Sequence, residues 1–326
     1  MKIRIISDIH RSINRNYPLS LKDNCDYTLI AGDLGPEFKK NANWIRKNVR
    51  KGAFVSGNHD AYDKDITIEE AKAFYHRTFP VDGDVSYLDA SVGAISKSLS
   101  EKVLLVGDIL YTDYAFPIAG LDEGLPEDQI VRNNIRRASP KMSGSYMNDF
   151  NYFTSDGSHA EDWEIDGTRG RKGAFYIRPE HYLEHFRKAF AAMTEIVESN
   201  PDKDVIVMTH HCLSPKCISD RFSKDTLNAS YVSDKDAWIA NHPNIRLVVS
   251  GHVHHRATFH VGDALYVLNP LGYCPYGENL SGENGEEWTP DLFVDTDTWT
   301  VSREEWKNPA WEKQYQSDTA LFSIFG

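Results

Sequence analysis

Short apolar runs recur along the chain, and each one ends abruptly in polar residues. The runs are rich in Val, Ile and Leu and are too short to form independent helices, which is typical of buried strands. They lie at residues 3–6, 27–31, 53–55, 103–106, 205–208, 247–249 and 265–268. We therefore predict a buried strand at each of these positions.

Amphipathic helices are predicted between the strands. Residues 181–199 place Tyr, Leu, Phe, Ala, Met, Ile and Val at three- and four-residue spacing, so one face of this helix is apolar. Residues 36–50 begin close to a Pro and end in basic residues, as helices commonly do, and residues 66–77 predict another helix. Strands that alternate with helices indicate an α/β architecture.

Two segments interrupt this alternation. Residues 110–178 are rich in Gly, Asp, Asn, Ser and aromatic residues and show no long periodic face, so we expect a loop-rich insertion over the surface. Residues 276–326 are acidic and contain four of the seven Trp residues, for which packing or a subunit contact is favoured over ligand binding. We expect one domain over 1–275 and a C-terminal extension over 276–326 packed on it.

Composition narrows the class of protein. A 40% hydrophobic content excludes a disordered chain, and a formal net charge of −12 opposes binding of nucleic acid mainly through phosphate neutralisation. The first eight residues lack the apolar core of a signal peptide, and no apolar run approaches the ~18 residues of a spanning helix. Four Cys residues do not make a disulfide framework in a chain of 326 residues. We expect a cytoplasmic protein without a membrane partner, in the host cytoplasm if it is phage-encoded.

Candidate metal ligands follow several of the predicted strands. The carboxyl ends of parallel strands open onto one crevice, so residues far apart in the sequence can meet there. Carboxylate, amide and imidazole groups together suit Mn, Fe, Zn or Ni, and are too rich in nitrogen for a Mg or Ca site. The sequences concerned are Asp8-Ile9-His10, Gly32-Asp33, Gly57-Asn58-His59-Asp60, Thr209-His210-His211 and Gly251-His252-Val253-His254-His255.

This ordered pattern resembles the calcineurin-like metallophosphoesterase superfamily, whose motifs are Asp-x-His, Gly-Asp, Gly-Asn-His-(Asp/Glu), His and Gly-His-x-His. The resemblance implies a four-layered αββα sandwich with two central sheets, here with an inserted cap and a C-terminal extension. It also implies two divalent ions, with Mn favoured in vitro among Mn, Fe, Ni and Zn. By resemblance, one ion is held by Asp8, His10, Asp33 and His254, and the other by Asp33, Asn58, His210 and His252, so that Asp33 bridges them.

The family's chemistry assigns roles to these groups. Two ions about 3.5–4 Å apart can share a hydroxide that attacks phosphorus, and no covalent intermediate is needed. By resemblance, His59 is the imidazole outside the ligand set that faces the leaving oxygen. Its neighbour Asp60 either orients His59 or caps the following turn.

The chain departs from the Ser/Thr protein phosphatases of this superfamily. Their Gly-Asp-x-x-Asp-Arg-Gly motif is replaced by Gly-Asp-Leu-Gly-Pro-Glu-Phe over residues 32–38, which removes the Arg that grips a dianionic monoester. Residues 106–114, 147–150 and 269–273 resemble a bacterial and phage subgroup. We expect a phosphodiesterase acting on a nucleotide or on nucleic-acid-type diesters, including single strands. The alternatives are a phosphomonoesterase on a nucleotide or small metabolite, a nuclease, and a non-catalytic metal-binding scaffold.

Four further residues are candidates for substrate binding, each with a second interpretation. His211 and His255 adjoin predicted ligands and contact either the substrate or the ligands themselves. Arg136 positions a phosphate or lies on a solvated helix face. Tyr111 either stacks on a base or packs in a small core of the insertion, and packing is favoured. The same two interpretations apply to Tyr114, Phe116, Tyr146, Phe150, Tyr152 and Phe153.

Overall fold

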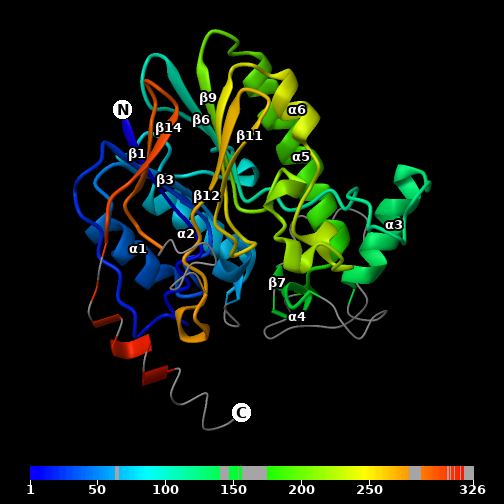
Figure 1. Ribbon diagram of the computed structural model, residues 1–326, viewed down its shortest axis with the longest axis horizontal. Coiled ribbons are helices and arrows are strands. Elements are labelled where there is room, and N and C mark those ends of the chain that lie inside the picture. Colours follow the sequence, from blue (N-terminus) through cyan, green and yellow to red (C-terminus); the bar gives the residue numbers. More distant parts are fainter. Residues whose placement is uncertain are drawn as a thin grey trace.

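Two six-stranded sheets lie face to face between outer layers of helices, in a computed structural model (Figure 1). The structure describes residues 1–62, 66–139, 147–152, 154–155, 175–278, 288–306, 308, 310–311, 313–315 and 317–318. Tyr146 and Phe153 lie outside this set, and the side chain of Tyr152 is not described.

The first sheet has the order β14-β13-β1-β2-β3-β4. Strands β1 to β4 are parallel, whereas β13 is antiparallel to both β1 and β14. The strands span Lys2–Ile6 (β1), Tyr27–Ala31 (β2), Gly52–Val55 (β3), Val85–Tyr87 (β4), Leu292–Asp295 (β13) and Thr300–Arg303 (β14).

The second sheet has the order β11-β12-β10-β9-β6-β5. Its four inner strands are parallel, and the two edge strands β5 and β11 are antiparallel to their neighbours. The strands span Ala257–Val261 (β11), Ala264–Leu268 (β12), Ile245–Ser250 (β10), Asp204–Thr209 (β9), Val103–Asp108 (β6) and Ser96–Ser98 (β5).

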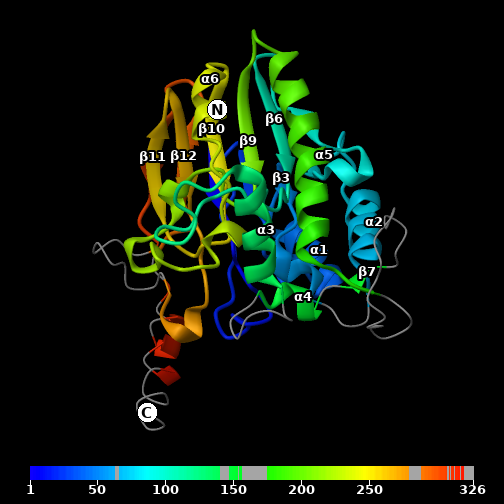
Figure 2. The same ribbon diagram turned by 90° about the vertical axis from the view of Figure 1, so that its right-hand side faces the viewer.

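Helices cover the outer faces of both sheets. Figure 1 shows α1 (Phe38–Asn48) and α2 (Ile68–Thr78) beside the first sheet, and Figure 2 shows α5 (Pro179–Glu198) in front of the second, with α6 (Asp236–Asn241) near its edge. Short 3₁₀ turns span Asn58–Ala61 (η1), Ala90–Val92 (η2), Pro215–Cys217 (η4), Asp220–Phe222 (η5), Asn228–Ser230 (η6) and Cys274–Tyr276 (η7).

Alternation of side chains along each strand explains the continuous apolar runs. Ile5 packs between the sheets, whereas Ile6 packs among the residues that contact α1 and α2. In the second sheet, Ile206 faces the first sheet, and Val207 packs in the cluster that contains α5 residues. Because both faces of each central strand are buried, both must be apolar. The seven predicted strands and the predicted α/β sandwich are confirmed, as are the three predicted helices, with small shifts at their ends.

The insertion is more regular than its composition predicts. It contains α3 (Glu127–Ala138), α4 (Asp149–Tyr152) and a two-stranded sheet of β7 (Thr154–Ser155) and β8 (Phe175–Tyr176). Apolar periodicity did not predict α3, because only three side chains of this helix are buried and one of them is the polar Asn134; its exposed Arg136 fits the solvated helix face that was one of its two interpretations. Tyr111, Tyr114 and Phe150 pack in a separate core of this region, as the favoured interpretation expects.

Described residues of the C-terminal part, from 288 onward, belong to the first sheet and to the core beside it. Strand β13 is hydrogen-bonded to β1 and β14 extends the same sheet, while Trp288 and Trp311 are buried in the cluster beside α1. Packing therefore accounts for these two Trp side chains. Across the described residues, no helix is both long enough and apolar enough to cross a membrane.

Candidate metal centre

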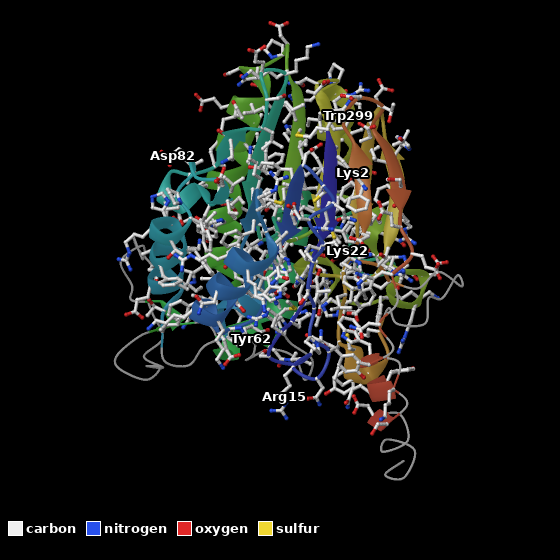
Figure 3. All side chains as sticks on the ribbon, turned by 90° about the vertical axis from the view of Figure 1, so that its left-hand side faces the viewer. Lys2, Arg15, Lys22, Tyr62, Asp82 and Trp299 are labelled. Carbon is white, nitrogen blue, oxygen red and sulfur yellow. The ribbon has the colours of Figure 1, made fainter. Side chains whose placement is uncertain are left out.

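The candidate ligands gather where the parallel strands end. In Figure 1 the N-terminus marks the upper end of β1, and the strand runs downward from it. Figure 3 shows Lys2 at the upper end of this strand and Tyr62, from the turn after β3, at the lower end of the molecule. The loops after β1, β2, β3, β9 and β10 carry all seven candidate ligands to this end.

Backbone strain is concentrated at these loops. Eight described residues other than Gly have a positive φ, and five of them are candidate ligands. Left-handed conformations are costly for residues with a side chain and persist mainly where the surroundings enforce them. The five are Asp8 (52°), His10 (43°), Asp33 (58°), His252 (70°) and His254 (48°).

The Gly residues of two motifs are required by close packing. A Cβ atom on Gly57 would lie 2.0 Å from Oδ1 of Asp33, and one on Gly32 would lie 2.4 Å from Nδ1 of His210. Neither contact is sterically possible without moving a candidate ligand. The motifs therefore contain Gly because the ligands pack against the backbone of neighbouring loops.

The first ligand group consists of Asp8, His10, Asp33 and His254. Each offers one ligand atom, and these atoms all lie within 4.8 Å of one another. Nε2 of His10 lies 2.8 Å from Nε2 of His254, which in turn lies 3.5 Å from Oδ1 of Asp8. Nitrogen and carboxylate oxygen converging on one point fit a divalent transition-metal ion.

The second ligand group adjoins the first. Oδ1 of Asn58 lies 2.9 Å from Nε2 of His210 and 3.1 Å from Nδ1 of His252. Oδ2 of Asp33 lies 3.5 Å from Nε2 of both His10 and His210, so this carboxylate stands between the two groups. The residues present therefore fit two ions with Asp33 as the shared ligand.

Electrostatics favour an ionised Asp33. Burial alone raises the pKa of this carboxyl, but the nearby His210, His59 and His10 hold it well below its ordinary value. Burial also lowers the pKa of His210, and Asp33 more than reverses this and raises it to about 9. Nδ1 of His210 donates to the carbonyl of Ala31 at 2.8 Å, which turns Nε2 toward Asp33 and Asn58.

His59 lies beside the ligands without belonging to either group. Its backbone N–H donates to Oδ1 of Asp33 at 2.8 Å, and its ring stacks on Tyr62 with centroids 4.2 Å apart. Its neighbour Asp60 accepts the backbone N–H groups of Gly35 and Gly57 at 2.7 and 2.8 Å. These contacts agree with the interpretation of Asp60 as a capping residue. Burial and the nearby Asp33 raise the pKa of Asp60 to about 7.

A cavity of about 360 Å³ opens beside the centre. One wall contains His59 and several candidate ligands, another consists of residues from 147–149, and a third of residues from 218–231. Tyr62, Tyr273 and Glu278 also line the cavity. This volume lies within the range of small-molecule sites, about 300–1,000 Å³.

The four predicted substrate-binding residues are not among the described residues that line this cavity. His211 is fully buried behind His252, with ring centroids 4.1 Å apart. Tyr111 is stacked on Tyr182 at 3.6 Å in the core of the insertion. Arg136 is exposed on α3, and His255 is half-buried. At these positions, none of the four side chains lines the described part of the cavity.

Asp149 supports the centre from the insertion; its run, residues 147–150, resembles a subgroup of the family, but the sequence pattern gave the residue no role. Its Oδ1 accepts the Asn58 side-chain amide at 3.0 Å and the Tyr62 hydroxyl at 2.5 Å, and its Oδ2 accepts the Tyr182 hydroxyl at 2.7 Å. By holding the amide nitrogen of Asn58, this carboxylate turns Oδ1 of Asn58 toward His210. The insertion therefore helps to position Asn58, a member of the second ligand group.

Replacing Asp149 with Ala is expected to weaken binding of one ion by about 10- to 100-fold, the usual cost of losing such a supporting contact. The substitution leaves the Asn58 amide free to rotate. The resulting loss of affinity for Mn²⁺ can be measured by calorimetric titration. Asp128→Ala removes an exposed carboxylate on α3 that pairs with Arg132 and should bind both ions normally. Unchanged binding in Asp149→Ala would contradict the supporting role.

Comparison with known proteins identifies the family. The model of the calcineurin-like phosphoesterase family matches residues 1–256. Phosphopantetheinyl hydrolase from Mycobacterium tuberculosis has a similar structure, with 16% identity, a TM-score of 0.61, and coverage of 83% of this chain and 89% of that chain. A Staphylococcus aureus protein described as a 5'-nucleotidase has 10% identity and a TM-score of 0.43 over 98% of this chain and 58% of its own.

The sulfate thiohydrolase SoxB from Thermus thermophilus has 10% identity and a TM-score of 0.36 over 91% of this chain and 42% of its own. No curated protein sequence matches the chain. The family match covers more than three quarters of the sequence and includes all seven candidate ligands. The chain therefore belongs to the calcineurin-like phosphoesterase family and is a metal-dependent phosphoester hydrolase.

Proposed function

We propose that the protein is a phosphodiesterase that hydrolyses a nucleotide or nucleic-acid-type diester in the cavity beside the metal centre. The observation that carries this proposal is the charge of the cavity wall. In the part of the lining that the structure describes, Asp149, Asp225 and Glu278 are present but no Lys or Arg. A monoester dianion needs cationic donors for its second charge, whereas a diester carries one charge that the ions can neutralise.

Different residues of the chain have different roles in the proposed hydrolysis. Two divalent ions, when bound at the ligands, supply Lewis acidity and lower the pKa of water toward neutrality. Asp33 fixes the two ligand groups relative to each other, and the Asn58 amide is held by Asp149. His59 lies outside both groups and lines the cavity, so its imidazole can donate to the leaving oxygen.

An aromatic wall supports a nucleotide-type substrate. Phe222 lines the cavity with 48% of its surface exposed, and Tyr231 also lines the cavity. The Phe222 backbone is held in place: its N–H donates to the carbonyl of Ser219 at 2.9 Å, and its carbonyl accepts the Asn228 side chain at 2.8 Å. An exposed phenyl ring on a hydrogen-bonded backbone offers a stacking face to a base.

The diester preference can be tested with Mn²⁺-loaded protein and matched aryl phosphates. We expect kcat/KM for a bis-aryl phosphate to exceed that for the mono-aryl phosphate by about 10- to 100-fold, because a charge-assisted hydrogen bond that the described part of the wall lacks is worth about 1.5–3 kcal/mol. Faster monoester hydrolysis would favour the phosphomonoesterase alternative. Binding of ions without hydrolysis of any ester, cyclic nucleotide or single strand would favour a scaffold.

The nucleotide preference can be tested at Phe222. Phe222→Ala should raise KM for a dinucleotide by about 10-fold, since stacking of one base is worth about 1–3 kcal/mol, and should change hydrolysis of a methyl aryl phosphate much less. Leu121→Ala removes another exposed apolar side chain, outside the described lining, and serves as the control. An equal effect of Phe222→Ala on both substrates would argue against base stacking.

We also place this activity in the cytoplasm. The four Cys residues (Cys25, Cys212, Cys217 and Cys274) are all unpaired in the structure. Unpaired thiols in a chain of this size are typical of a reducing compartment. Its substrate is accordingly expected among the phosphate esters of that compartment.

A further inference from the structure

The segment that follows β12 returns to the metal centre, although it lies beyond the family match at residues 1–256. The backbone N–H of Gly272 donates to the carbonyl of Asp8 at 3.0 Å, and the Asn14 side chain donates to the carbonyl of Gly272 at 2.7 Å. The segment is thereby attached to the loop after β1 that carries two candidate ligands. It brings Tyr273 and Glu278 to the cavity wall.

Glu278 contacts a candidate ligand from behind. Its Oε2 accepts Nδ1–H of His254 at 2.7 Å and the backbone N–H of Tyr273 at 2.9 Å. A carboxylate at Nδ1 fixes the proton there, so Nε2 of His254 is left as the nitrogen that faces His10 and Asp8. Supporting carboxylates of this kind orient metal-binding His rings and raise their basicity.

Tyr273 contacts the imidazole that lies outside the ligand groups. Its hydroxyl oxygen lies 3.1 Å from Nε2 of His59. Its ring meets the rings of His10 and His254, each at a centroid distance of 4.6 Å. With Tyr62 stacked on one face of His59, the Tyr273 hydroxyl fixes the direction in which Nε2 points.

We propose that Glu278 and Tyr273 are positioning residues of the catalytic centre: Glu278 sets the ring of His254 for the first ion, and Tyr273 sets the ring of His59 for the leaving group. The role of Glu278 rests on metal binding alone, whereas that of Tyr273 rests on the proposed hydrolysis. The acidic residues beyond 275 therefore do more than pack, because one of them completes the centre.

The role of Glu278 can be tested by titrating metal-free protein with Mn²⁺ in a calorimeter. In Glu278→Ala, one of the two ions is expected to bind about 10- to 100-fold more weakly while the other changes little. The Mn²⁺ affinity of Glu278→Gln should lie between those of Glu278→Ala and the wild type, because the Gln amide oxygen still accepts Nδ1–H but carries no charge. Glu304→Gln removes a carboxylate that pairs with Lys2 away from the centre and should bind both ions normally.

A double variant separates positioning from a general loss of stability. If Glu278 acts through His254, then His254→Ala and His254→Ala/Glu278→Ala should bind Mn²⁺ equally, because the second change has no ring left to orient. Three results would overturn the proposal: normal binding in Glu278→Ala, additive weakening in the double variant, or a wild type that binds no Mn²⁺.

The role of Tyr273 can be tested with Tyr273→Phe, which removes only the hydroxyl. We expect kcat to fall by about 2- to 10-fold, the value of one hydrogen bond, with KM and Mn²⁺ binding unchanged and a larger loss for poor leaving groups. Tyr27→Phe removes another hydroxyl, at the start of β2 at the far end of the sheet, and is the control. Wild-type kcat with every leaving group, or loss of an ion, would overturn this assignment.

A readout without substrate keeps this inference separate from the proposed function. Tyr273→Phe should shift the ¹⁵N signals of the His59 imidazole in protein loaded with diamagnetic Zn²⁺, and Tyr27→Phe should not. If the wild type hydrolyses no ester, the proposed function fails, while the Mn²⁺ titrations and the His59 signals still decide the two positioning roles. Unshifted His59 signals in Tyr273→Phe would overturn the contact itself.

Discussion

Asp33→Asn is expected to reduce Mn²⁺ binding from two ions to at most one and to lower kcat/KM by at least about 10³-fold, because the ions supply several kcal/mol of transition-state stabilisation. The physical reason is the position of the carboxylate, whose Oδ2 lies 3.5 Å from Nε2 of both His10 and His210. The amide of Asn keeps the shape but carries no charge. A neutral amide oxygen in the place of Oδ2 is a much weaker ligand for two cations than a carboxylate oxygen.

The measurements are metal content after dialysis and steady-state hydrolysis of a bis-aryl phosphate. Asp23→Asn removes an exposed carboxylate that pairs with Arg50 and provides a matched control. In the metal-free protein, loss of Asp33 should also lower the pKa of His210 from about 9, since Asp33 raises it against the effect of burial. Two retained ions with an unchanged rate would refute the bridging role.

The candidate ligands could be named from the sequence because short apolar runs mark the buried strands, and the ordered motifs at their ends resemble those of the family. Both faces of such a strand must be apolar, and the residue at which polarity returns marks the carboxyl end of the sheet. Asp33 illustrates this, since it follows β2 directly after Gly32. Topology then places these ends together, whereas the choice of ligands among the residues there came from the resemblance to the family.

Residues that support the ligands could not be predicted in this way. Asp149 stands in an insertion without strong periodicity, and Glu278 is one of many acids in the C-terminal part of the sequence. Each reaches the centre through the tertiary course of a loop, so its contact with Asn58 or His254 has no counterpart in local spacing. Helix α3 was missed for a related reason, because its buried stripe is narrow and partly polar.

His211 shows that nearness in sequence to a candidate ligand does not by itself give a residue access to the cavity. His211 follows a candidate ligand directly, yet its ring turns into the interior and is fully buried. Burial lowers the pKa of His211 well below its ordinary value, so it stays neutral there. Successive residues after a strand point in different directions, and only the backbone course of each loop decides which one meets the cavity.

His59→Gln is expected to lower kcat by about 10²- to 10⁴-fold while both Mn²⁺ ions remain bound. The structure gives the reason for this separation. The His59 backbone N–H, which Gln retains, donates to Asp33, whereas the ring lies in the cavity lining outside both ligand groups. The substitution should therefore remove the proton donor for the leaving oxygen and leave the ion-binding groups in place.

The leaving group provides the sharpest test of this role. An aryl oxygen with a low pKa leaves without much help from a proton, whereas an alkyl oxygen needs one, so His59→Gln should harm hydrolysis of alkyl diesters more than that of nitrophenyl diesters. His260→Gln, at an exposed position on β11, should change neither substrate. Loss of an ion in His59→Gln would make His59 a ligand, and equal losses across leaving groups would assign its effect to geometry instead of proton donation.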